Sequence, residues 1–157
     1  MSGVVVIGVG NRYRRDDGAG PAVLDALATD TTAVHARLVE LDGEPARVVD
    51  AWTGADLAIV VDALRSDDSA AGTVRRVEVG EDVGVLGDSS GAAGGSHGLG
   101  IGTAAALGTA LGRMPARLVV FAVEGANFGH GDELSEPVRR AVTEVTARIA
   151  AEIAGSG

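Results

Sequence analysis

The chain has 157 residues, of which 46% are hydrophobic, and a formal net charge of −9. A chain of this length is expected to form a single domain, residues 1–157, and to bury about two-thirds of its unfolded surface. The negative charge argues against nucleic acids and anionic membranes as partners, because both need a basic binding face. The sequence contains no cysteine, which excludes disulfides and thiolate catalysis.

The sequence contains neither an evident signal peptide nor a membrane span. No basic segment followed by a long apolar run precedes the first predicted strand, and no stretch approaches the roughly 20 apolar residues that cross a bilayer. A cytoplasmic location is therefore expected.

The first predicted strand is the apolar run Val4–Ile7, whose β-branched residues without polar alternation are typical of a buried parallel strand. Gly8 and Gly10 follow and allow a tight turn. The turn is not a dinucleotide fingerprint, because Tyr13 stands where the third glycine belongs, and it is not a P-loop, because the chain has no lysine.

Asp16 and Asp17 follow this turn and precede a helix predicted over residues 18–28. Carboxylates at such positions stabilise the free N–H groups and the positive end of the helix dipole, so the pair is expected to open the helix. A single cap suffices for one helix. The doublet therefore favours a second role for one of the two acids.

Strands and helices are predicted to alternate along the rest of the chain. This order predicts a mostly parallel sheet between helical layers. The remaining predicted strands cover residues 34–41, 57–61, 72–79 (at an edge) and 117–123, and the remaining helices cover residues 45–54, 99–111 and a terminal stretch from about 135. Residues 80–96 form a long glycine- and serine-rich loop, and we expect residues 84–98 to be mobile until substrate docks.

Acidic residues follow several predicted strands. The carboxyl ends of parallel strands share one edge of a sheet, where open α/β folds bind ligands. His97 begins a predicted helix, and such helix starts lie at the same edge. Carboxylates with one imidazole suit a divalent first-row metal. The acids are Asp16, Asp17, Asp42, Asp62 and Glu124.

Each of these residues also has a structural alternative. Asp17 could be only a cap, Asp62 could end its strand in an Asx-turn, and His97 could cap its helix. His35 and His130 are expected to be structural or solvated. A serine hydrolase is disfavoured because no Gly-x-Ser-x-Gly elbow follows a buried strand.

Five motifs are spread over nearly the whole chain: GVGNRYRRDDGAG at 8–20, LDG at 41–43, VVDA at 60–63, SHGLG at 96–100 and FAVEGANFGHGDELSEPV at 121–138. Together they resemble those of the [NiFe]-hydrogenase maturation proteases, which trim the C-terminus of the hydrogenase large subunit. The resemblance implies a three-layer α/β/α sandwich with a mostly parallel central sheet. The chain departs from the family's pattern where Glu44 and Pro45 follow the second motif.

The resemblance further implies a site and a substrate. Asp17, Asp62 and His97 would be the ligands that recognise nickel, and the nickel would arrive with the large-subunit precursor. Asp17 and Asp62 are the candidates for catalysis, and neither is assigned as the base. Asn11, Asp42 and Glu124 are expected to contact the substrate.

Two other functions stay open at this point. A non-catalytic nickel carrier or chaperone in hydrogenase assembly would use the same three ligands. A nucleotide-binding or small-molecule-binding domain would rest on Gly8 and Gly10, and the missing third glycine and lysine make it the weakest alternative.

Overall fold

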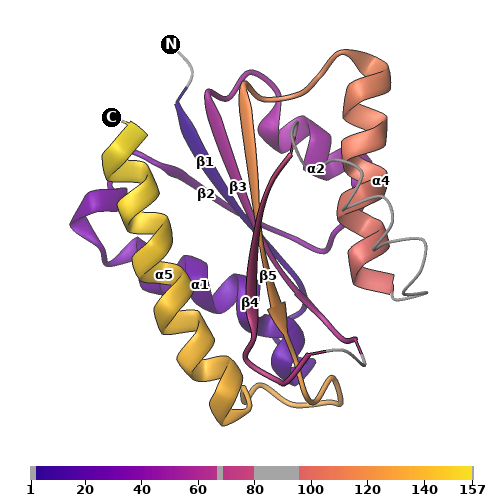
Figure 1. The fold of residues 1–157 in the computed structure, drawn as a ribbon, viewed down its shortest axis with the longest axis vertical. Coiled ribbons are helices and arrows are strands. Elements are labelled where there is room, and N and C mark those ends of the chain that lie inside the picture. Colours follow the sequence, from indigo (N-terminus) through magenta and orange to yellow (C-terminus); the bar gives the residue numbers. More distant parts are fainter. Residues whose placement is uncertain (1–2, 67–68, 80–95, 157) are drawn as a thin grey trace.

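A computed structural model of the chain describes residues 3–66, 69–79 and 96–156. The expectation that residues 84–98 are mobile falls mainly on residues 84–95, which lie outside the described residues. The described strands form one five-stranded sheet with the order β2-β1-β3-β5-β4 (Figure 1). The strands are β1 (Val4–Val9), β2 (Arg37–Leu41), β3 (Leu57–Leu64), β4 (Val74–Val79) and β5 (Arg117–Glu124).

The sheet is parallel except for β4, which pairs antiparallel with β5 at the edge. Among the described residues, two helices cover each face of the sheet, so the three-layer α/β/α sandwich with a mostly parallel sheet is confirmed (Figure 1). The helices on one face are α1 (Ala19–Ala28) and α5 (Glu136–Ser156), and those on the other are α2 (Pro45–Trp52) and α4 (Ser96–Leu111). Short 3₁₀ helices, η1 and η2, cover Arg15–Gly18 and Thr31–Ala33.

The core has two apolar halves because side chains alternate between the faces of each strand. On β3, Ile59 and Val61 belong to the half under α1 and α5, and Ala58 and Val60 belong to the half under α2 and α4. All four are fully buried. This two-sided burial explains why β3 is apolar without alternation in the sequence.

Each strand differs from its predicted bounds at one end, and the differences are largest for the second and third strands. The second strand begins at Arg37 and not at Val34, because residues 31–33 form a 3₁₀ helix capped by Asp30. Val34 is 70% exposed. The third strand continues through Asp62 to Leu64, and Asp62 pairs with Ala122 of β5. Asp62 therefore lies within a strand and does not end one.

Candidate active site

Asp17 and Asp62 lie at neighbouring strands near the carboxyl edge of the sheet. Asp17 belongs to η1, directly after β1, and Asp62 lies on β3, which pairs with β1. Both residues are only 3% exposed. Burial, together with the charge of Asp17, raises the pKa of Asp62 well above its ordinary value. The two acids therefore form an electrostatically coupled pair.

One carboxylate oxygen of this pair, Oδ1 of Asp62, is buried without a hydrogen bond from the described residues. Buried carboxylate oxygens are normally hydrogen-bonded, and an exception in a native fold calls for an explanation such as a catalytic role or an ion. Asp62 is thus suited to accept a proton or to contact a cation.

His97 lies in the first turn of α4, which begins at the same edge of the sheet. The end of α4 leads to the opposite edge, where Arg117 N donates to the Asp56 carbonyl at the start of β5. The side chain of His97 lies outside the described part of the structure. Among the described side chains, no group of three acids or histidines could hold a metal ion. The three-ligand site therefore stays a prediction.

Asp17 is held by the turn that follows β1. The backbone N–H of Asn11 donates to Asp17 Oδ2 at 2.9 Å, and the N–H of Asp17 donates to the Arg14 carbonyl at 3.1 Å. Residues 11–17 thus fold back on themselves. One oxygen of the Asp17 carboxylate is thus held by its own loop, and this carboxylate does not cap α1.

The prediction that the acid pair caps the first helix is wrong. The N-cap of α1 is Gly18, and no side chain caps it. Asp16 instead accepts hydrogen bonds from the connection between β5 and α5. Burial by itself would raise the pKa of Asp16, but hydrogen bonds from Ser135, Ala126 and Asn127 outweigh it and lower the pKa.

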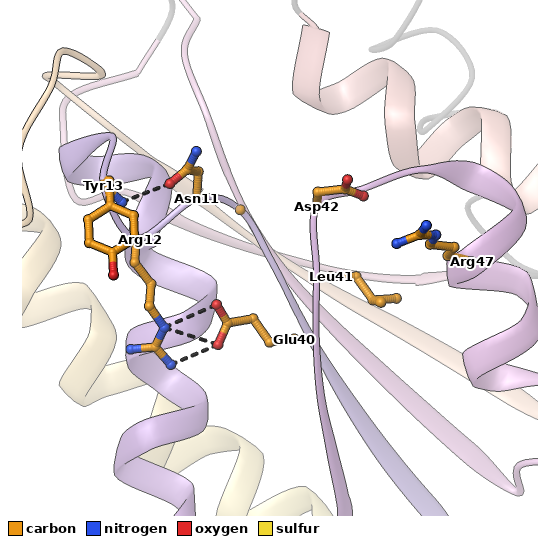
Figure 2. A pocket seen from close by; sticks show the side chains of 8 residues that line it. Asn11, Arg12, Tyr13, Glu40, Leu41, Asp42 and Arg47 are labelled. Carbon is orange, nitrogen blue, oxygen red and sulfur yellow. Dashed lines mark hydrogen bonds and ion pairs between the residues drawn. The ribbon is translucent and has the colours of Figure 1, made fainter.

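Asn11 and Asp42, two of the expected substrate contacts, lie together in a pocket of about 310 Å³. Figure 2 shows the turn after β1 on one side of this pocket and the start of α2 on the other. Both side chains organise local turns, since Asn11 accepts from Tyr13 N and Asp42 accepts from Glu44 N. The pocket is lined by Gly10, Asn11, Arg12, Tyr13, Glu40, Leu41, Asp42 and Arg47.

Arg12 joins the walls of this pocket, and sequence reasoning did not single it out. Its guanidinium donates to both oxygens of Glu40, at the end of β2, and to both oxygens of Asp25 on α1 (Figure 2 shows the Glu40 contacts). The partners are 13 and 28 residues away in sequence. Local sequence patterns therefore carried no signal for this ion pair network.

Glu124, the third expected substrate contact, lies away from the pocket lining. It is 4% exposed and accepts hydrogen bonds from Ser66, at 2.6 Å from the backbone N–H and 2.9 Å from the hydroxyl. Glu124 thus holds the connection that follows β3. His35 and His130 are exposed, as expected.

None of the helices within residues 3–66, 69–79 and 96–156 is both long and apolar enough to cross a membrane.

Neither a protein-family model nor a curated protein sequence matches the chain. Solved structures do match over its whole length.

Three of these structures illustrate the likeness. A hydrogenase maturating endopeptidase, HybD from Escherichia coli, is 21% identical with a TM-score of 0.77, over 100% of this chain and 94% of that one. The [NiFe] hydrogenase maturation protease HybD from Thermococcus kodakarensis is 22% identical with a TM-score of 0.75, over 98% and 99% of the two chains. An endopeptidase from Escherichia coli is 19% identical with a TM-score of 0.81, over 100% and 94%. The chain has the fold of the [NiFe] hydrogenase maturation proteases.

Proposed function

We propose that the chain is an endopeptidase that removes the C-terminal extension of a nickel-loaded [NiFe]-hydrogenase large-subunit precursor in the cytoplasm. The observation that carries the proposal is the coupled, buried pair of Asp17 and Asp62 on this fold. The E. coli and T. kodakarensis structures that share the fold are named as hydrogenase maturation endopeptidases.

The pair of acids suits a substrate that brings its own cation. Two carboxylates buried side by side cost free energy, because burial and the charge of Asp17 disfavour ionisation of Asp62. Nickel carried by the precursor would remove this penalty, so the site would favour nickel-loaded precursor over the empty form. In this proposal His97, from the first turn of α4, supplies the third ligand.

The same pair can assist hydrolysis of the peptide bond. Hydrolysis requires a base that takes a proton from the attacking water, and a base works best when its pKa lies near the ambient pH. Asp62 has a raised pKa, so it is a candidate for this base. Asp17, held by Asn11 N, would then orient the metal end of the substrate.

The pocket between the turn after β1 and the start of α2 is the proposed seat of the peptide. Its lining includes Asn11 and Asp42, both exposed, so a chain segment could reach both. Glu124 would act on the substrate only indirectly, through the Ser66 connection that it holds.

Mass spectrometry of a precursor before and after incubation with the chain tests this function. Nickel-loaded precursor should lose a C-terminal peptide, whereas nickel-free precursor should keep its mass. Calorimetry with free nickel tests the carrier function in parallel. Tight stoichiometric nickel binding together with unchanged precursor masses would refute the peptidase and favour the carrier.

A further inference from the structure

Asp16 is the most completely hydrogen-bonded acid of the described residues, although it sits beside the proposed site and not in it. Its side chain is fully buried. Oδ2 accepts from Ala126 N at 2.7 Å, from Asn127 N at 2.9 Å and from the Ser135 hydroxyl at 2.9 Å. Oδ1 accepts from Ser135 N at 2.7 Å. One carboxylate therefore accepts hydrogen bonds from both ends of the connection between β5 and α5.

Backbone hydrogen bonds join the same two segments. Arg15 N donates to the Gly131 carbonyl at 2.8 Å, Gly131 N donates to the Tyr13 carbonyl at 2.9 Å, and Asp16 N donates to the Asn127 carbonyl at 2.9 Å. Arg15 adopts a φ of 48°, which is uncommon for a residue other than glycine. The backbone of η1 is thus fixed by residues more than 100 positions away.

Asp17 follows Asp16 directly and needs such support. Asp17 and Asp62 are both buried and carry like charges when ionised, so the pair would tend to separate if η1 were free to move. The backbone of Gly10 packs closely against Asp17 on one side, since a Cβ added to Gly10 would lie 1.8 Å from the Asp17 carbonyl oxygen. The contacts of Asp16 with residues 126–135 restrain η1 from the other side.

We propose that Asp16 is a positioning residue for the peptidase reaction, because its four hydrogen bonds to residues 126–135 hold η1 in place and keep Asp17 beside Asp62. This inference rests on the proposed function. Asp16 itself touches neither substrate nor metal.

Asp16→Asn is the most direct test, because the amide keeps the shape of the side chain but puts a donor where Ser135 N now meets an acceptor. With nickel-loaded precursor, kcat should fall by about 100-fold, the size of effect that a misplacement of about 1 Å produces. KM should rise by a smaller factor than kcat falls, because the peptide pocket is untouched and only the contact of Asp17 with the nickel is displaced. Val145→Ala, a buried change on α5, is the control, and it should lower the melting temperature with kcat unchanged. Normal kcat in folded Asp16→Asn would overturn the proposal.

A thermodynamic cycle gives a readout that does not depend on cleavage. Asp62→Asn should raise the melting temperature of the wild type by relieving repulsion with Asp17, and it should raise that of Asp16→Asn less, because Asp17 can then move away. Equal increases would contradict the positioning role. Ser135→Ala, which removes one of the four hydrogen bonds, takes the place of Asp16→Asn if that variant does not fold. If the wild type cleaves no precursor, the proposed function fails, and this cycle still decides the role of Asp16.

Discussion

Gly10 and Asp17 pack backbone against backbone: a Cβ on Gly10 would lie 1.8 Å from the Asp17 carbonyl oxygen. Gly10 also has a φ of 143°, which side chains of L-residues rarely allow. Its N–H donates to the Leu41 carbonyl at 3.0 Å, so it cannot easily move. The glycine after β1 is therefore needed to bring an acid back toward the sheet, and not to approach a phosphate.

Gly10→Ala should destabilise the fold by about 3 kcal/mol, because the alanine would adopt a strained positive φ and its Cβ would also clash with the Asp17 carbonyl oxygen. Gly54→Ala is the matched control. Gly54 also has a positive φ, of 82°, but a Cβ there meets nothing within 4 Å, so only about 1 kcal/mol of strain is expected. Urea unfolding of both variants measures the difference. Equal losses would show that the contact with Asp17 can relax.

Asp62→Asn should stabilise the protein by about 2 kcal/mol at neutral pH while it lowers cleavage. The folded pKa of Asp62 is raised, so the wild type loses stability as the pH rises from about 4, the unfolded value, through the folded value. The variant lacks this loss. Melting temperatures of both proteins, measured between about pH 4 and 8, should therefore diverge as the pH rises. Asp50→Asn, an exposed change, should leave the profile unaltered, and parallel profiles for Asp62→Asn would contradict the coupling.

Ser135→Ala should destabilise the protein by about 1 kcal/mol, the net contribution of one buried hydrogen bond, which here runs from the hydroxyl to Asp16. The pKa of Asp16 is lowered in the fold, so the stability from its hydrogen bonds is present above about pH 4 and is lost as the pH falls through the folded value. Acid unfolding measures this effect. Thr143→Ala removes an exposed hydroxyl from α5 and should have little effect at any pH. A similar loss of stability in both variants would show that the hydrogen bond from Ser135 to Asp16 contributes no more than an exposed hydroxyl does.

Arg12→Ala should affect the substrate more than the fold. Exposed ion pairs contribute only about 0–1 kcal/mol, so the loss of the contacts with Glu40 and Asp25 should barely change the melting temperature. The pocket wall would become mobile, and KM for precursor should rise by about fivefold with kcat nearly unchanged. Arg113→Ala breaks the exposed pair with Asp50 and is the control. An unchanged KM for Arg12→Ala would show that the precursor peptide does not bind in this pocket.

Much of the fold could be predicted from local patterns. The strands of residues 4–7 and 57–61 were recognisable because two-sided burial leaves an uninterrupted apolar run, and Pro45 marked the start of α2 correctly. The predicted second strand included Val34, but the structure leaves it exposed, since the 3₁₀ helix at residues 31–33 changes the direction of the chain. Propensity does not report such tertiary context.

The site was less predictable, for a physical reason. Parallel topology brought Asp17 and Asp62 to neighbouring strands, and this could be inferred from the order of elements. The partners of Asp16 lie 110 to 119 residues away, so no local pattern distinguishes a carboxylate that joins two segments from one that caps a helix. Arg12 was missed for the same reason.

The most direct test of the account compares the cleavage of nickel-loaded precursor by the wild type with that by Asp17→Asn, Asp62→Asn and His97→Ala, using intact-mass spectrometry, with Asp50→Asn as the control. The wild type and the control should release the C-terminal peptide, and each of the three variants should leave the precursor at its full mass while remaining folded. Complete processing by all three variants would contradict the account.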